Sequence, residues 1–165
     1  MLKGLLFLLI LGVLCGLLLH TSDLLTAAPI AKNREAAARL LVAELTGEDV
    51  SEMIQLDSNI NLQCPDWVLL EEVVPGYAGP ITFLVYVEGT SISARTKQHR
   101  ETPGIGDFID SSRDSYLTDL DHAYPETWLN LDSVTGATVT SDALGRAVSR
   151  AYERSQLICA ETEDE

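Results

Sequence analysis

The sequence predicts an α+β fold, in which an apolar N-terminal transmembrane helix precedes one small domain with an antiparallel sheet and a C-terminal helix. Three patterns predict it: an apolar run over residues 5–19, segments rich in β-branched and aromatic residues from Trp67 onward, and an apolar repeat at helical spacing beyond Asp142. The chain has 165 residues, so enough remain outside the apolar run for one domain with a core. We therefore expect a single domain.

The apolar run over residues 5–19 is the first element. Its flanks extend it toward the ~20 residues that a bilayer-spanning helix needs. Lys3 precedes the run and Asp23 follows it, and this charge bias favours an N-terminus in the cytoplasm. We therefore expect a transmembrane anchor over residues 1–22. The alternatives are a cleaved signal peptide, whose apolar core is usually about 7 to 15 residues long, and lipidation at Cys15, which the large residue before it disfavours.

A second helix is predicted to continue from the anchor. Apolar residues recur at helical spacing between Ala31 and Leu45, with charged residues mostly between them, and Gly47 ends the pattern. The polar stretch that follows has no strong period. We assign residues 23–66 to a stalk helix and a connecting segment.

Three strands are predicted in the domain, which we assign to residues 67–159. Residues 67–74 and 81–87 are rich in β-branched and aromatic side chains, and a loop rich in Pro and Gly separates them. A turn at residues 88–90 leads into the alternating segment 91–96, which is expected to pair antiparallel with the strand before it.

The rest of the domain contains one more predicted strand and the final helix. Residues 129–132 resemble a short edge strand. The final helix is expected over residues 142–157, because its apolar residues repeat at helical spacing, and Ser141 is its expected N-cap. Residues 160–165 include a block of acidic side chains that should be a solvated tail.

The charge balance excludes one class of partner. The chain has 25 acidic against 11 basic residues and a formal net charge of -14 at pH 7. Such a chain would repel a phosphate backbone rather than release its counterions. We therefore expect no nucleic acid as a partner.

A cluster of hydroxyl side chains lies just ahead of the final helix. Thr135, Thr138 and Thr140 surround the small residues Gly136 and Ala137, which would let a bulky donor reach the Thr138 hydroxyl. A phosphate on that hydroxyl would face the helix N-terminus, where unpaired N–H groups and the macrodipole favour anions. On chemistry alone, the alternative is an ordinary helix cap rich in Ser and Thr.

This cluster resembles the flavinylation motif of FMN-binding domains, which occur in the G subunit of Rnf/Rsx electron-transport complexes and in the C subunit of the sodium-pumping quinone reductase. The matching residues are Asp132 and the run Thr135-Gly136-Ala137-Thr138. In that family the threonine after Gly-Ala carries FMN through a phosphoester bond, which the resemblance places on Thr138. It further implies that a separate flavin transferase installs the cofactor from FAD and recognises a sequence that includes Asp132.

A second segment, residues 99–107, resembles the H-x-E-T-P-G-L-G-D stretch of the Rnf G subunit. Its two glycines permit close backbone approach to a flat ring and leave amides free to hydrogen-bond that ring. Its candidate cofactor-binding residues are Glu101, Thr102, Gly104 and Gly106. Solvation or a local turn bond is the alternative for its charged residues. Residues 75–79 resemble the G-Y-S-G loop of the same family.

The resemblance implies a covalent-FMN electron carrier subunit of a membrane electron-transport complex of the Rnf/Rsx type. The subunit would relay single electrons on the extracytoplasmic side of a bacterial inner membrane, with coupling to ion translocation left open. Its expected partners are the membrane, other membrane subunits of the complex and the flavin transferase. It would be an electron-transfer subunit of a redox-driven translocase rather than a stand-alone catalyst.

Two alternatives stay open at this point. The chain is an orphan flavinylated carrier for another quinone-linked or extracellular reductase, or a membrane-tethered assembly module without a cofactor. The family generally has a longer extracytoplasmic region with another hairpin before the position of Pro75, so we expect a smaller sheet and a more open pocket here.

The cysteines and the remaining candidate ligands favour no metal site. Cys64 and Cys159 lie outside the anchor, and in an oxidising compartment they are candidates for a disulfide, with two free thiols as the alternative. No CxxC motif and no His pair at helical spacing is present.

Some aromatic and basic side chains remain as weaker candidates for flavin contact. The aromatic residues in reach of the motifs are expected in the core rather than on a flavin; they are Tyr77, Tyr116, Tyr124 and Trp128. Arg95 and Lys97 are candidates to neutralise the phosphate, although a solvated strand end is the expected place for both.

Overall fold

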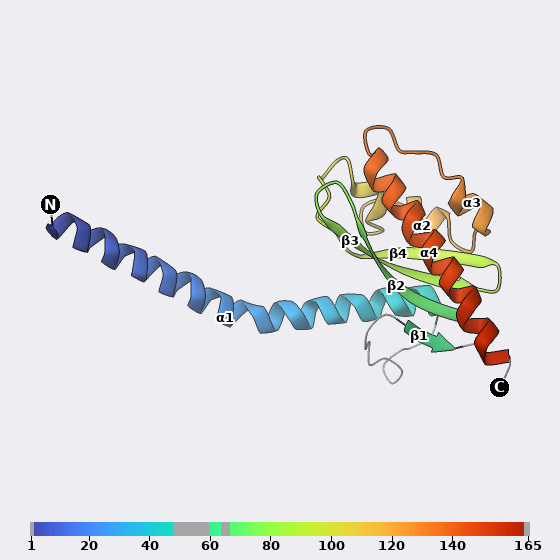
Figure 1. Cartoon of the computed structure of the whole chain (residues 1–165), viewed down its shortest axis with the longest axis horizontal. Helices are drawn as coiled ribbons and strands as arrows, with labels where there is room; N and C mark the ends of the chain where they lie inside the picture. The colour runs from blue at the N-terminus through green and yellow to red at the C-terminus, as the bar shows by residue number, and fades with distance from the viewer. Residues whose placement is uncertain (1, 48–59, 64–66, 164–165) are drawn as a thin grey trace. The chain divides into compact units, whose positions relative to one another are not determined.

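The computed structural model describes residues 2–47, 60–63 and 67–163. It divides into two compact units, Met1–Ala38 and Arg39–Glu165. Helix α1 (Leu2–Thr46) begins in the first unit, and its last turns belong to the second. Figure 1 shows the course of the chain through both.

The first unit consists of helix α1 alone, and its side chains are exposed over residues 3–37. Leu5 is 64% exposed and Leu19 is 73% exposed. By its length and composition, helix α1 is long and apolar enough to cross a membrane. It runs on without interruption through residue 22, so the boundary between anchor and stalk stays a prediction.

The second unit is built on a four-stranded antiparallel sheet in the order β1-β2-β3-β4. The strands are β1 (Ile60–Gln63), β2 (Trp67–Pro75), β3 (Pro80–Glu88) and β4 (Ser91–Gln98). The three predicted strands are confirmed as β2, β3 and β4. Strand β1 was not predicted, because four residues are too few to carry a clear strand pattern.

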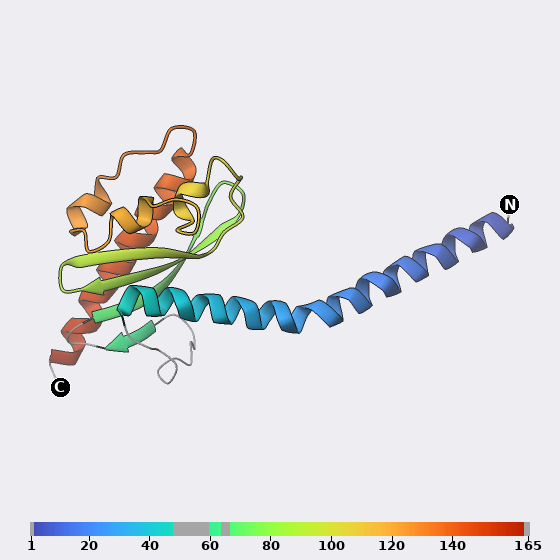
Figure 2. The ribbon, with the colours of Figure 1, turned by 180° about the vertical axis from the view of Figure 1, so that it is seen from behind.

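Both faces of the sheet are covered (Figures 1 and 2). On one face Phe83 and Val85 belong to the same core cluster as Leu144 of helix α4 (Thr138–Glu163). On the other face Leu84 packs with Val42, which lies in the last turns of α1. Neighbouring residues of a strand point to opposite faces, so this double cover explains why β3 is buried on both faces between its exposed ends.

Three short helices connect β4 to α4 and complete the core. They are η1 (Asp107–Ile109), α2 (Tyr116–Asp119) and α3 (Pro125–Leu129). Each contributes at least one fully or nearly fully buried side chain to the face covered by α4: Ile109, Leu117 and Trp128. The predicted α+β fold, with an apolar N-terminal helix and a C-terminal helix, is therefore confirmed.

Residues 129–132 do not form the predicted edge strand. Leu129 ends α3, and the residues after it have no regular structure. Pro125 occupies the first turn of α3, where its fixed φ suits a helix. The Trp128 indole N–H donates to the Ile92 carbonyl at 3.1 Å, which holds this helical turn against the start of β4.

Helix α4 is longer at both ends than predicted. It begins at Thr138 instead of Asp142, so Ser141 is not its N-cap. It also continues through residues 160–163, which the sequence assigns to the acidic tail. The turn before the helix causes this early start, and that turn is part of the candidate site.

Arg95 is buried rather than placed at a solvated strand end. It is 3% exposed and donates to both carboxylate oxygens of Asp121, at 2.7 and 2.6 Å, and to Glu44 at 2.8 Å. Burial alone would lower the pKa of the guanidinium, but the bonds and charges of these carboxylates outweigh it and raise that pKa. Lys97 pairs with Glu71 at 2.5 Å. Both cations are therefore occupied by carboxylates.

Two leucines of α4 test how the helix packs. Leu144 is fully buried, whereas Leu157 is 68% exposed. Leu144→Ala should lower the free energy of unfolding by about 2–5 kcal/mol, because it removes buried methyl groups and leaves a cavity. Leu157→Ala should change it by less than about 0.5 kcal/mol. Denaturant unfolding of the full chain in detergent micelles, followed by tryptophan fluorescence, measures both. Equal losses would contradict this packing.

Candidate functional site

A tight turn over residues 134–137 leads directly into helix α4. The Ala137 N–H donates to the Val134 carbonyl at 2.9 Å. Gly136 has a φ of 83°, which glycine adopts without steric cost and which a type II turn requires at this position. The turn makes Thr138 the first residue of the helix.

Ser141 fastens this turn to the helix. Its Oγ accepts a hydrogen bond from the Val134 N–H and donates one to the Ala137 carbonyl, both at 3.1 Å. The Ser141 N–H donates to the same carbonyl at 2.9 Å. The hydroxyl expected to cap the helix therefore lies inside its first turn, and it fixes the loop from there.

Thr138 is exposed at the N-terminus of α4. The first N–H groups of a helix have no intrahelical acceptor, and the macrodipole adds a partial positive charge at this end. A phosphate carried by the Thr138 hydroxyl would lie close to these groups. The local structure thus has the anion-favouring character that the sequence predicts.

A cavity of about 290 Å³ opens beside Thr138. The loop after β2, the segment after β4 and the start of α4 all contribute to it. Its lining residues are Tyr77, Glu101, Thr102, Ile105, Gly136, Ala137, Thr138, Val139 and Thr140. The cavity therefore brings together the two segments that the sequence analysis singled out, which lie more than 30 residues apart in the chain.

Four predicted site residues are absent from the lining of this cavity: Asp132, Thr135, Gly104 and Gly106. Thr135 is exposed in the turn before α4. Asp132 lies near Tyr116, where burial of the phenol and the charge of Asp132 raise the pKa of Tyr116. The predicted roles of Asp132 and Thr135 therefore stay predictions.

Glu101 joins the three segments of the cavity. It is 7% exposed, so solvation does not explain it. Its Oε1 accepts a hydrogen bond from the Ala78 N–H at 3.1 Å, and its Oε2 accepts one from the Thr140 hydroxyl at 2.6 Å. Its own N–H donates to His99 Nδ1 at 3.2 Å. One buried carboxylate thus connects the loop after β2 to the first turn of α4.

Two glycines make room for Glu101. A Cβ added to Gly76 would lie 2.6 Å from Glu101 Oε1 and 2.4 Å from Ile81 Cδ1. A Cβ added to Gly106 would lie 2.3 Å from the Glu101 Cβ. All three distances are well inside van der Waals contact. The atoms near Gly76 are the ends of side chains that can shift, whereas Gly106 faces the Glu101 Cβ, so the packing requires glycine most strictly at position 106.

The amides of the glycine-rich segment are already engaged. The Gly104 N–H donates to Asp107 Oδ2 at 2.9 Å. The N–H groups of Ile105 and Gly106 donate to the Thr102 carbonyl at 3.1 and 2.9 Å. The expectation that Gly104 and Gly106 leave amides free to bind a ring is therefore wrong. The amides close a local turn instead, in which Gly104 has a φ of 82°.

Asp110 stabilises the chain just after this turn. Burial alone would raise the pKa of its carboxyl, but hydrogen bonds from Ser112 and the charges of His99 and Arg113 outweigh burial and lower that pKa. Since the folded pKa lies below the unfolded value of 3.8, ionised Asp110 stabilises the fold fully above pH 3.8. This contribution is lost as the pH falls through the lowered pKa.

Of the aromatic residues considered for flavin contact, Tyr77 is the one that lines the cavity, and it is 75% exposed. Trp128 is buried in the core, as expected. Tyr116 packs edge-on against Phe108, with ring centroids 5.2 Å apart. Tyr124 is exposed and outside the lining. The expectation of a core position is therefore wrong for Tyr77 and Tyr124.

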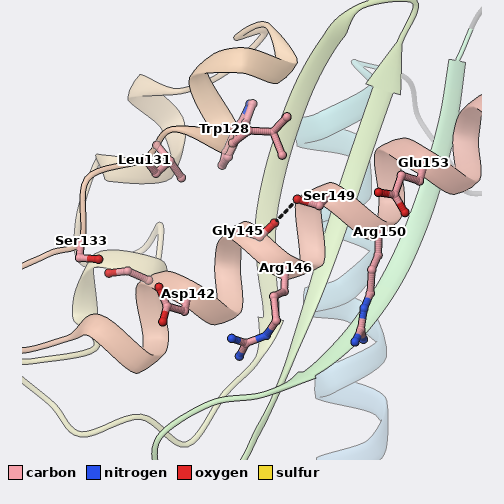
Figure 3. A pocket seen from close by; sticks show the side chains of 11 residues that line it. Trp128, Leu131, Ser133, Asp142, Gly145, Arg146, Ser149, Arg150 and Glu153 are labelled. Carbon is pink, nitrogen blue, oxygen red and sulfur yellow. Dashed lines mark hydrogen bonds between the residues drawn. The ribbon is translucent and has the colours of Figure 1, made fainter.

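A second cavity, of about 390 Å³, runs along α4 beside α3 (Figure 3). Arg146 and Arg150 project from successive turns of α4, with Asp142 and Glu153 before and after them (Figure 3). Arg146 donates to the Pro75 carbonyl at 3.1 Å. None of the predicted cofactor-binding residues lines this cavity. Charged residues of both signs line it, so it differs chemically from the 290 Å³ cavity.

Two further predictions concern metal ions and cysteines. Within residues 2–47, 60–63 and 67–163, no group of three or more His, Cys, Asp or Glu side chains is placed to hold a metal ion. The predicted disulfide lies outside the described part of the chain, because neither Cys64 nor the side chain of Cys159 is described.

Comparison with known proteins identifies relatives of this domain. Residues 76–153 match the family described as FMN-binding domain. The chain is 34% identical over 100 residues to the G subunit of the ion-translocating oxidoreductase complex of Buchnera aphidicola from Acyrthosiphon pisum. The matched stretch covers 52% of this chain and 61% of the relative.

Two other relatives with the same name are similar to the chain over a comparable stretch. The Escherichia coli O157:H7 protein is 36% identical over 101 residues, or 53% of this chain and 49% of the relative. The Shewanella baltica protein is 34% identical over 101 residues, which cover 53% of this chain and 48% of the relative. The chain thus spans about half the length of the curated relatives it matches.

The family match begins in the loop after β2 and ends within α4. It therefore includes every residue that lines the 290 Å³ cavity. The cavity, the exposed Thr138 and the anion-favouring helix N-terminus all lie inside the matched region. Residues 76–153, which hold this candidate site, therefore match the FMN-binding domain family.

Proposed function

We propose that the chain is a membrane-anchored electron carrier in which FMN is bound covalently, through its phosphate, to Thr138. The observation that carries this proposal is the exposed Thr138 hydroxyl, which lies at the first position of α4 and on the wall of the 290 Å³ cavity. A phosphoester at this hydroxyl would keep the cofactor beside the cavity. The helix N-terminus would stabilise the phosphate by about 0.3–1 kcal/mol.

The chemistry of the lining suits a flavin. Tyr77, Ile105 and Val139 are 75%, 51% and 45% exposed, and they give the cavity an uncovered apolar surface of the kind that marks a binding site. Thr102 and Glu101 add polar atoms to the same wall. A flat ring with an apolar face and polar edges needs both kinds of contact.

When bound, FMN supplies a redox centre that accepts and donates single electrons. The residues of the chain hold and orient it: Thr138 provides the attachment point, the exposed apolar side chains cover part of the ring, and Glu101 fixes the wall. The acidic surface of the protein, with its net charge of -14, disfavours the addition of a second negative charge near the ring. One-electron exchange with protein partners is therefore the proposed activity.

The apolar part of α1 supports a place in the membrane. Helix α1 would anchor the chain in a bacterial inner membrane, and the FMN domain would lie in the periplasm. The relatives are named as the G subunit of an ion-translocating oxidoreductase complex. Their name supports other membrane subunits of an Rnf/Rsx-type complex as partners and ion translocation as the coupled process. A flavin transferase would attach the cofactor.

Removal of the Thr138 hydroxyl tests the attachment site. The full chain, coexpressed with a flavin transferase, should gain the mass of one FMN phosphoester and retain yellow fluorescence in a denaturing gel. Thr138→Ala should lose both signals completely, because no oxygen remains to form the ester. Thr127→Ala is the matched control, because Thr127 is exposed on α3 and outside the cavity, and it should keep full labelling. Covalent flavin on Thr138→Ala protein would refute the assignment.

Two Gly→Ala changes test the packing behind the cavity wall. Gly106→Ala should lower the free energy of unfolding by about 1–3 kcal/mol, because its Cβ would overlap Glu101 and force the wall to move. Gly145→Ala, inside α4, meets nothing within 4 Å and should stabilise the helix by up to about 1 kcal/mol.

The flavin absorbance spectrum supplies a second measurement for this pair. The spectrum of loaded protein should change in Gly106→Ala and stay the same in Gly145→Ala, because only Gly106 packs against the wall. Unaltered stability and an unaltered spectrum in Gly106→Ala would contradict the packing of Glu101 against this glycine.

A further inference from the structure

Glu101 is a buried acid whose bonding partners carry no charge. It is 7% exposed and accepts hydrogen bonds from the Ala78 amide and the Thr140 hydroxyl. In the part of the chain that the structure describes, it takes part in no ion pair. Burial of a charge without an opposite charge costs free energy that hydrogen bonds offset only in part.

The other buried acid of the described residues is held differently. Glu72 is 6% exposed and pairs with Arg154 of α4. That pairing is the usual arrangement for a buried carboxylate. Glu101 departs from it, and it is also the acid that lines the cavity beside Thr138.

The two hydrogen bonds that join the Glu101 side chain to Ala78 and Thr140 do not need its charge. A glutamine side chain has the same length, and its carbonyl oxygen accepts a hydrogen bond from the Ala78 N–H. Its amide nitrogen donates to the Thr140 hydroxyl, which accepts as well as donates. The connection between the two segments would therefore survive without the charge, so the charge itself needs another explanation.

We infer that the Glu101 carboxylate lowers the reduction potential of the flavin held in this cavity, an inference that rests on the proposed attachment of FMN to Thr138. Reduction adds an electron to the ring, and a fixed negative charge in the same cavity makes that step less favourable. No cation of the described residues pairs with the carboxylate to cancel its field. Glu101 is thus a positioning and tuning residue, and the electron itself is exchanged with the partners of the relay.

The test is the midpoint potential of the loaded full chain, measured by spectroelectrochemical titration in detergent. Glu101→Gln should shift the potential to more positive values relative to wild type. Glu88→Gln is the matched control, because Glu88 is exposed at the end of β3 opposite to the end that adjoins the cavity loop. It removes the same charge from the chain and should leave the potential unchanged.

A change that keeps the charge separates tuning from packing. Glu101→Asp shortens the side chain, so it should weaken the hydrogen-bond tie and lower the thermal midpoint without a positive shift in potential. A purely structural role predicts loss of stability in Glu101→Asp and an unchanged potential in Glu101→Gln. That result, with FMN covalently bound in both proteins, would overturn the inference.

Thr140→Val provides an independent arm if Glu101→Gln does not accumulate. It removes the hydroxyl that shares the charge on Oε2, so the potential should move to more negative values, opposite to the shift expected for Glu101→Gln. An unmoved potential in Thr140→Val would also overturn the inference. The intact mass of the wild-type chain separates failure of this inference from failure of the proposed function. An unmodified mass would contradict the attachment of FMN itself.

Discussion

The cavity depends on the two hydrogen bonds that Glu101 accepts. One comes from Ala78 in the loop after β2, and the other comes from Thr140 in the first turn of α4. The need for glycine at position 106 follows from the placement of Glu101, because a Cβ on Gly106 would overlap the Glu101 Cβ. The wall beside Thr138 is therefore set by Thr140, which is close to it in the sequence, and by Glu101, Ala78 and Gly106, which are far from it.

The elements with strong local patterns could be predicted from the sequence. Strands β3 and β4 have β-branched residues on both sides of a short turn, in which Gly89 takes a φ of 58°, and local turn chemistry determines such a hairpin. Helix α4 has an apolar repeat that is visible in its sequence alone. The motif around Thr138 was also visible, because its residues are contiguous and small ones give access to the hydroxyl.

The parts set by tertiary contacts could not be predicted. The burial of Glu101 and Arg95 depends on partners more than 20 residues away, and a charged residue in a sequence gives no sign of such pairing. Residues 129–132 have strand-like composition, but the contact of Trp128 with Ile92 holds the preceding turn as a helix. The start of α4 was misplaced because Ser141 bonds backward to Val134, whereas a cap bonds forward along its own helix.

The openness of the cavity gives a physical reason for a covalent link. Its volume of about 290 Å³ lies at the lower limit of ligand pockets, which are about 300–1,000 Å³, and Tyr77, Ile105 and Val139 stay exposed at its edge. Such a cavity would enclose only part of a flavin, so non-covalent binding would be weak. A phosphoester on Thr138 would make return of the ring to the cavity intramolecular, at an effective concentration on the order of mM. Weak contacts then suffice to position the ring, and its uncovered edge stays accessible for electron exchange.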